Sequence, residues 1–198
     1  SDYGLPNFAK STGTLLIASS YSGNTEETLD ALETANRAGM LVAAIAIGGK
    51  LLKRAEELGI PYIQMPDTGI QPRLALGYSI TSMLAFMGQH QLRDQARSLA
   101  SRLDASAAKE HGQSLAALLR DQIPVIYASR RNMAVAYNWK IKFNETGKIP
   151  TFYNVFPELN HNEMNGFDVA ASTRDLSKQF HFIFLCDTAD TPRIQKRM

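Results

Sequence analysis

Cysteine is nearly absent from this chain of 198 residues, which contains one cysteine and four histidines. Cys186 cannot form a disulfide within the chain, and such low cysteine use is typical of a reducing compartment, so we expect a cytoplasmic protein. Because Cys186 ends the apolar run that starts at Phe182, we expect a buried and unreactive thiol. The histidines and the cysteine show no metal-ligand spacing, so the sequence predicts no metal site.

Long apolar runs and a strong net charge are also absent. No segment approaches the ~20 apolar residues that a membrane-spanning helix requires, so we expect no membrane association. The net charge is only +2, and the basic cluster Lys196-Arg197 lies at the C-terminal end. A nucleic-acid-binding surface needs a concentrated basic patch, so we expect no nucleic-acid partner. Any anion that binds here is therefore bound by local geometry.

The two ends of the sequence predict a fragment or a processed polypeptide. The chain starts at Ser1 without an initiator methionine or a signal-peptide pattern. Residues 193–198 have the pattern of a helix that stops after its first turns.

Apolar runs of strand length alternate with helical patterns in the first half. Strands are predicted at 13–19, 41–47 and 62–64, and amphipathic helices at 24–38 and from Leu51 to Leu58. Fully apolar strands separated by such helices predict a parallel sheet that is covered on both faces and joined by right-handed crossovers.

A helical connector and a second α/β series follow. Residues 72–119 have no strand pattern and are predicted to be helical. Strands are predicted at 124–128, 151–156 and 180–186, with a helix at 133–146. In each half a strand ends in serine, Ser19 or Ser129, before a polar loop and a helix. The sequence thus predicts an α/β fold of two subdomains, residues 1–105 and 106–198.

Hydroxyl side chains are concentrated in the loop after the first predicted strand, residues 19–25. Open α/β sheets bind ligands where a strand ends and a helix begins, and the N–H groups and dipole of that helix favour an anion. Ser20, Ser22 and Thr25 can donate to phosphate oxygens, and Gly23 permits a close backbone approach. The pattern favours a phosphate monoester as the ligand.

An ordinary helix cap is the competing interpretation of this loop. Ser, Asn and Thr are common N-cap residues, and Asn24 followed by Glu27 has the spacing of a capping box. The loop carries three hydroxyls beyond what one cap needs, which favours the phosphate site.

The loop and three later segments carry a resemblance to a known family. Residues 20–28, SYSGNTEET, resemble the signature of the sugar isomerase (SIS) domain, which occurs in phosphosugar isomerases and in regulators that bind phosphosugars. The segments QPRLALGY (71–78), FNETGKIP (143–150) and FPELNHNE (156–163) resemble the bifunctional phosphoglucose/phosphomannose isomerase family. The resemblance implies two SIS-type subdomains of three-layer αβα, flavodoxin-like architecture. It also implies an aldose–ketose isomerase that interconverts glucose 6-phosphate, and mannose 6-phosphate, with fructose 6-phosphate through a cis-enediol.

The resemblance also implies roles for individual residues. It assigns phosphate binding to three hydroxyl residues, Ser20, Ser22 and Thr25. Glu145 would be the catalytic base, His161 would assist opening of the sugar ring, and Arg73 would stabilise negative charge on the enediolate. These roles suit the chemistry, because the isomerisation needs a base at C2, a cation near the developing oxyanion and an acid–base group for ring opening.

Further implications concern assembly and completeness. The resemblance implies a homodimer whose active site draws on both subunits, and the apolar helical pattern at 74–87 offers a surface to bury. No cofactor or metal is required. A phosphate-contacting serine loop of the family would precede Ser1, and a lysine implicated in ring opening would follow Met198.

Each assignment has an alternative. Glu145 could be a solvated helix residue paired with Lys142 or Lys148, and His161 could be a surface or loop-stabilising histidine. The whole protein could be a non-catalytic regulator that binds phosphosugars. A pure sensor has no need of the Glu145 and His161 pair, which favours the enzyme.

Overall fold

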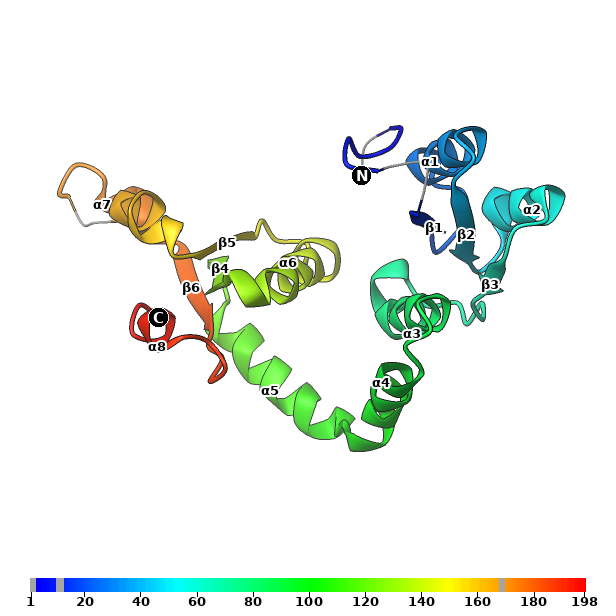
Figure 1. The fold of residues 1–198 in the computed structure, drawn as a ribbon. Coiled ribbons are helices and arrows are strands. Elements are labelled where there is room, and N and C mark those ends of the chain that lie inside the picture. Colours follow the sequence, from blue (N-terminus) through cyan, green and yellow to red (C-terminus); the bar gives the residue numbers. More distant parts are fainter. Residues whose placement is uncertain (1–2, 10–12, 168–169) are drawn as a thin grey trace. The chain divides into compact units, whose positions relative to one another are not determined.

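The computed structural model describes residues 3–9, 13–167 and 170–198 and divides into two compact units, Ser1–Leu103 and Asp104–Met198 (Figure 1). The described part of each unit contains a three-stranded parallel sheet, with strand order β1-β2-β3 in the first and β5-β4-β6 in the second. The predicted α/β fold, with parallel sheets flanked by helices, is confirmed.

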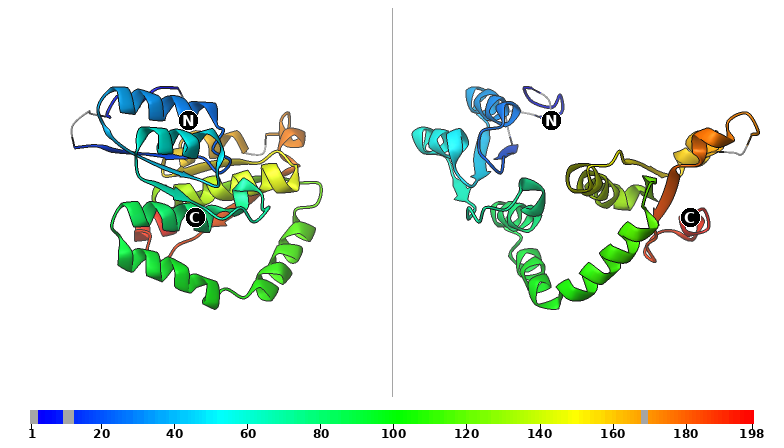
Figure 2. Two further views of the ribbon diagram at one scale, coloured as in Figure 1. Left: turned by 90° about the vertical axis from the view of Figure 1, so that its right-hand side faces the viewer. Right: turned by 180° about the vertical axis from the view of Figure 1, so that it is seen from behind.

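The first unit is built from two consecutive strand–helix–strand repeats. Strands β1 (Leu15–Ser19), β2 (Leu41–Ala46) and β3 (Tyr62–Gln64) are joined by α1 (Glu26–Arg37) and α2 (Gly49–Leu58). Both crossovers proceed in the same direction across the sheet, so α1 and α2 lie on one face of it (Figure 2). The three-layer arrangement is therefore only partly present in the described part of this unit.

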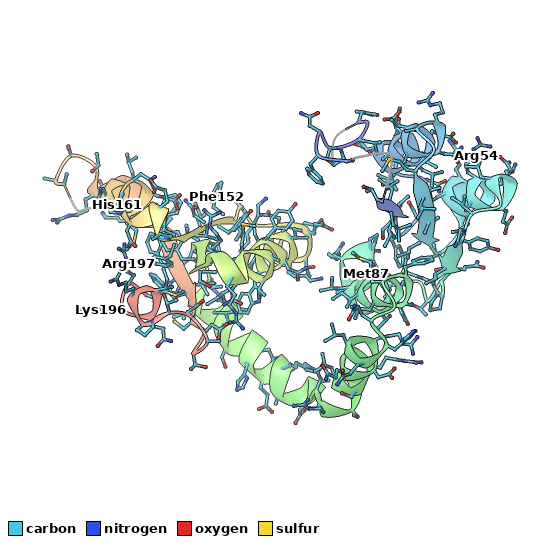
Figure 3. The ribbon with its side chains drawn as sticks, in the orientation of Figure 1. Arg54, Met87, Phe152, His161, Lys196 and Arg197 are labelled. Atoms are coloured by element: carbon cyan, nitrogen blue, oxygen red, sulfur yellow. The ribbon has the colours of Figure 1, made fainter. Side chains whose placement is uncertain are left out.

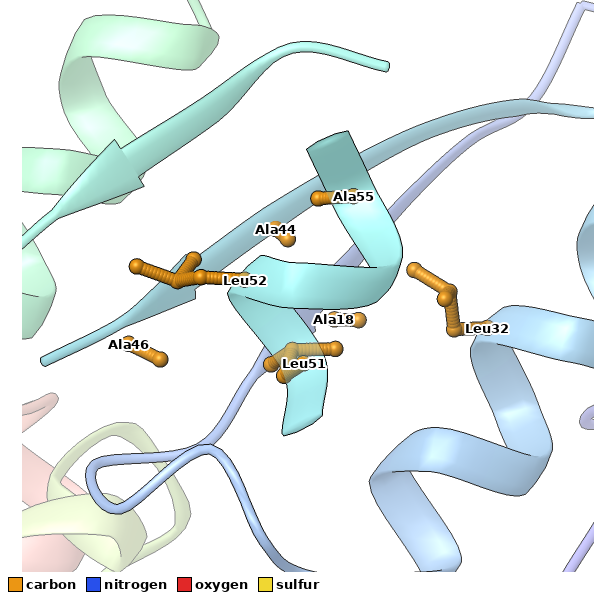
Figure 4. Packing of buried hydrophobic residues seen from close by; sticks show 7 residues of the cluster. All are labelled: Ala18, Leu32, Ala44, Ala46, Leu51, Leu52 and Ala55. Carbon is orange, nitrogen blue, oxygen red and sulfur yellow. The ribbon is translucent and has the colours of Figure 1, made fainter. Parts of the chain in front are cut away.

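Small side chains on the strands let the two helices approach the sheet closely. The buried cluster consists of strand alanines and helix residues, namely Ala18, Ala44, Ala46, Leu32, Leu51, Leu52 and Ala55 (Figure 4). Burying each leucine side chain contributes about 1.5–3 kcal/mol. Helix α2 ends where Gly59 takes the left-handed conformation, at φ 65°. This packing fixes the start of each helix at the carboxyl edge of the sheet.

The predicted helical connector is confirmed. It consists of four elements: η1 (Pro72–Leu74), α3 (Leu76–Phe86), α4 (His90–Arg102) and α5 (Ala105–Leu118). Asp104 is the N-cap residue of α5, and its carboxylate accepts from the backbone N–H groups of Ser106 and Ala107. Within residues 3–9, 13–167 and 170–198, no helix combines the length and the apolar character needed to cross a bilayer.

The second unit combines a central strand with short turns and helices. In chain order these are β4 (Ile123–Ser129), η2 (Arg130–Asn132), α6 (Met133–Lys142), η3 (Phe143–Gly147), β5 (Phe152–Phe156), η4 (Glu158–Asn160), η5 (Glu163–Phe167), α7 (Arg174–Ser177), β6 (Phe180–Leu185) and α8 (Pro192–Gln195). The three strands predicted for this half are confirmed.

Both faces of the second sheet are covered, because β4 alternates its side chains between two apolar clusters. Ile126 and Ala128 pack with Ala136 of α6 on one face. Val125 and Tyr127 pack on the other face, against residues of the η4 and η5 turns and of α8. The alternation follows from the two-residue period of a strand.

The prediction of a buried Cys186 is wrong, because its thiol is exposed. Strand β6 ends at Leu185, so Cys186 is the first residue beyond the ladder rather than the last one inside it. It lines a surface hollow together with Asp187 and Thr188. An apolar run predicts a strand, but it does not show at which residue the pairing with the neighbouring strand ends.

Candidate active site

The predicted phosphate loop lies at the carboxyl end of β1 and enters α1 at Thr25, the N-cap residue. The Ser20 and Thr25 hydroxyls share a hydrogen bond of 2.7 Å, and the Gly23 N–H donates to Ser20 Oγ at 3.1 Å. Ser20 is only 7% exposed, whereas Ser22 and Thr25 are exposed. Ser20 therefore organises the loop from inside, while the other two hydroxyls lie on its surface.

The alternative prediction, a capping box between Asn24 and Glu27, is wrong. Thr25 is the N-cap residue, and its side chain makes no cap hydrogen bond. Asn24 Oδ1 instead accepts from the backbone N–H of Lys50 at 3.1 Å, because the start of α2 competes for this amide. The first N–H groups of α1 receive no acceptor from the cap side chain, which suits the binding of an anion at the positive end of the helix.

The turn between β2 and α2 supports the loop, and the sequence analysis missed it. The Leu51 N–H donates to Gly23 O at 2.9 Å. A Cβ atom at Gly23 would lie 1.9 Å from Gly48 O, and one at Gly49 would lie 2.4 Å from Ser22 O. The two segments therefore pack backbone against backbone, at a distance that only glycine allows. The available signal was the Gly48-Gly49 pair directly after an apolar strand.

Gly49→Ala is expected to weaken phosphate binding about tenfold, because the added methyl group displaces the Ser22 carbonyl at a cost on the order of 1–3 kcal/mol. Gly59→Ala is the matched control. Both glycines have positive φ, +72° and +65°, but no atom lies within 4 Å of the Cβ position at Gly59. Both variants lose about 1–2 kcal/mol of stability from the left-handed backbone.

Calorimetric titration with inorganic phosphate and thermal unfolding separate the two effects. A larger loss of thermal stability in Gly49→Ala than in Gly59→Ala, with weaker phosphate binding in Gly49→Ala alone, supports the role of this turn. Equal phosphate affinity in the two variants would show that the turn does not shape the loop.

Glu145 lies in η3, a π-helical turn that continues α6. The helix predicted at 133–146 therefore changes its hydrogen-bonding pattern after Lys142. The Asn144 side chain donates to Ile149 O at 2.9 Å, and the turn ends at Lys148, which has φ 56°. The wider turn presents the exposed Glu145 carboxylate at a fixed point of the chain. Such π-turns occur frequently at functional sites.

His161 follows η4 and its side chain is exposed (Figure 3). Its backbone N–H donates to Glu158 O at 2.9 Å, and its carbonyl accepts from Asn165 Nδ2 at 2.9 Å. The fully buried Leu159 packs this turn onto the sheet. The backbone of His161 is thus held on both sides while its imidazole projects from the turn.

Arg73 is half-buried in η1, between β3 and α3. It belongs to the first unit, as does the loop that contains Ser20, Ser22 and Thr25. Glu145 and His161 belong to the second unit, where they follow β4 and β5 in the chain.

The loop after β4 differs from the loop after β1, although each follows a strand ending in serine. Ser129 Oγ accepts from the Asn132 N–H at 3.3 Å, and Asn132 Nδ2 donates to Asp187 Oδ2 at 2.9 Å. The Asn132 hydrogen bond, with smaller contributions from the Ala189 N–H and the Arg131 charge, lowers the pKa of Asp187. In this second loop the Asn132 amide therefore already binds a carboxylate of the chain, that of Asp187.

Comparison with known proteins identifies the fold. Residues 108–198 match the family described as "Bacterial phospho-glucose isomerase C-terminal SIS domain". The solved structure of tagatose-6-phosphate ketose/aldose isomerase from Escherichia coli has the same fold, with a TM-score of 0.63 at 18% identity. That match covers 92% of this chain and 50% of the other chain. The architecture is therefore that of the SIS domains.

Similarity to curated relatives identifies the family more closely. The chain is 34% identical to a bifunctional phosphoglucose/phosphomannose isomerase of Aquifex aeolicus and 38% identical to that of Thermoplasma acidophilum. Both matches cover 100% of this chain and 60% of the relative. The chain belongs to the bifunctional phosphoglucose/phosphomannose isomerase family and spans about 60% of the length of these relatives.

Proposed function

We propose that the intact protein interconverts glucose 6-phosphate, and mannose 6-phosphate, with fructose 6-phosphate. The observation that carries the proposal is the similarity of the whole chain to isomerases of this double specificity. The phosphate loop supports it, because Ser22 and Thr25 expose their hydroxyls beside a helix start that has no side-chain cap. The single Cys186 fits a reducing cytoplasm.

The proposed steps follow from the chemistry of the residues. Ser20, Ser22 and Thr25 form the phosphate loop, and His161 assists opening of the sugar ring. Glu145 takes the proton from C2, the C1–C2 double bond forms, and negative charge develops on O1, where Arg73 stabilises it. Glu145 then returns the proton to C1, O1 is protonated, and loss of the O2 proton creates the C2 carbonyl. Glucose and mannose 6-phosphates differ only at C2, so both give the same enediol.

A coupled assay of the intact protein tests the proposal. Fructose 6-phosphate is supplied, and formation of glucose 6-phosphate and mannose 6-phosphate is followed by separate coupling enzymes. We expect both products. Tight phosphosugar binding without turnover would contradict the proposal and would favour a regulatory SIS module.

We also propose a homodimer whose active site draws on both subunits. In its support, α3 exposes apolar side chains along one helical face, with 47% exposure at Leu76, 41% at Ile80 and Met83, and 57% at Met87 just beyond its end. Burying apolar surface contributes roughly 25 cal/mol per Å². This face of α3 lies within residues 74–87, where the sequence predicts an apolar helical surface to bury.

Ile80→Glu is expected to shift the protein toward monomers, because a carboxylate would be desolvated in the interface. Gln91→Glu, which adds the same charge on α4, is the control. Light scattering gives the oligomeric state, and specific activity is measured across the same dilution series. If the site is shared, activity falls with the dimer fraction. A monomer with full activity would defeat the proposal.

A further inference from the structure

The carboxylate of Glu163 is bound by two neighbouring strands of the second sheet. Tyr127 of β4 and Asn154 of β5 are direct partners in the ladder and therefore face the same side. The Tyr127 hydroxyl donates to Glu163 Oε1 at 2.9 Å, and Asn154 Nδ2 donates to Glu163 Oε2. Each carboxylate oxygen thus has its own donor, and the two donors are fixed by the register of the sheet.

The side chain of Tyr127 is completely buried, so water cannot accept a hydrogen bond from its hydroxyl. Its ring contacts Phe156, Phe182 and Phe184, with centroid distances of 5.5–6.1 Å. A hydroxyl in such surroundings needs an acceptor, and Glu163 is the one it has. Burial first, and then the hydrogen bond and charge of Glu163, raise the pKa of Tyr127. The hydroxyl therefore remains a donor at all physiological pH values.

Glu163 is connected to His161 through a short hydrogen-bonded turn. The Glu163 N–H donates to Asn162 Oδ1, and Asn162 Nδ2 donates to Glu158 Oε1 at 3.3 Å. The Glu158 carbonyl in turn accepts from the His161 N–H. A displacement of Glu163 from the sheet is therefore transmitted to the backbone that carries the imidazole.

We propose that Glu163 is a positioning residue for His161, which it places by fixing the 158–165 turn to Tyr127 and Asn154. The inference rests on the proposed role of His161 in ring opening. Glu163 itself faces the sheet rather than the exposed side on which His161 projects, so it acts through His161. Leu159 packs the start of this turn onto the sheet, and Glu163 attaches the segment that follows His161. Loss of this second attachment would give the imidazole more freedom, and misplacement by about 1 Å can lower a rate substantially.

Tyr127→Phe tests this proposal in the intact protein, because it removes one donor and keeps the aromatic packing. Tyr153→Phe is the control. Tyr153 precedes Asn154 on β5, and its side chain packs on the opposite face of the sheet. We expect Tyr127→Phe to lower kcat/KM for glucose 6-phosphate about tenfold and Tyr153→Phe to leave it within about twofold.

The decisive comparison repeats both variants in a His161→Ala background. If Glu163 acts through His161, Tyr127→Phe lowers kcat/KM by less than about twofold there. The same fold-loss in both backgrounds would mean a purely structural role and would overturn the proposal. Glu163→Gln, measured in the same two backgrounds, provides the equivalent test if Tyr127→Phe does not fold.

An NMR measurement makes the outcome independent of turnover. In protein labelled with ¹³C in the histidine rings, Tyr127→Phe should shift or broaden the His161 resonance and leave those of His90 and His111 unchanged. An unchanged His161 resonance would overturn the positioning role even if the isomerase activity is established. Absence of activity in the wild-type protein would instead contradict the proposed function, while the NMR result would still decide this inference.

Discussion

Glu145→Gln is expected to leave hexose 6-phosphate binding intact while turnover falls ~10²–10⁴-fold. Glutamine keeps the size and much of the hydrogen bonding of the side chain, but it cannot accept the C2 proton. The substitution changes one atom on the η3 turn, and it keeps the hydrogen bond from Asn144 Nδ2 to Ile149 O that holds the backbone of this turn. The expected loss is therefore in kcat, with little change in affinity.

Exchange of the C2 proton with deuterated solvent, followed by NMR, reports this step directly. Glu110→Gln, which removes the same charge from an exposed position on α5, is the control and should exchange at the wild-type rate. His161→Ala should behave differently from Glu145→Gln, because open-chain substrate bypasses a ring-opening catalyst. Wild-type exchange in Glu145→Gln would show that Glu145 is not the base.

The sequence was sufficient to predict the elements whose periodicity depends on burial alone. The apolar run from Leu41 forms β2, which is buried along almost its whole length. The strand–loop–helix containing Ser20, Ser22 and Thr25 was also predictable, because an apolar strand followed by polar residues and an amphipathic pattern leaves few alternatives.

Contacts between distant segments could not be predicted in the same way. Asn24 has the sequence context of a helix cap, yet its side chain binds the backbone of Lys50, which is 26 positions away. The choice depends on how closely the β2–α2 turn approaches, and that distance is set by Gly23 and Gly49. Local propensity describes the competitors for a hydrogen bond but does not determine which of them wins.

The sequence context of Glu163 likewise gave no indication of its partners. It occurs in a polar segment with His161, where a solvated side chain is the simplest expectation. Only the pairing of Tyr127 with Asn154 across β4 and β5 creates two donors at the right spacing for one carboxylate. The partners of such a polar residue can therefore be predicted only when the register of the strands is known.

Replacing both Ser22 and Thr25 by alanine is expected to weaken hexose 6-phosphate binding by at least about tenfold. Hydrogen bonds to charged groups contribute ~1.5–3 kcal/mol each, and 1.4 kcal/mol corresponds to a tenfold change in affinity. Ser20 is left in place because its buried hydroxyl accepts from the Gly23 N–H, a hydrogen bond inside the loop that the double variant keeps. Thr34→Ala, near the other end of α1, is the control.

The same double variant distinguishes a phosphate site from a helix cap. Loss of a working N-cap costs about 0.5–2 kcal/mol of stability, but the Thr25 side chain makes no cap hydrogen bond. We therefore expect a large loss of affinity in calorimetric titration and a small change in thermal unfolding. The opposite result, wild-type affinity with a clearly lowered melting temperature, would mean that these hydroxyls serve the helix and that the phosphate is bound elsewhere.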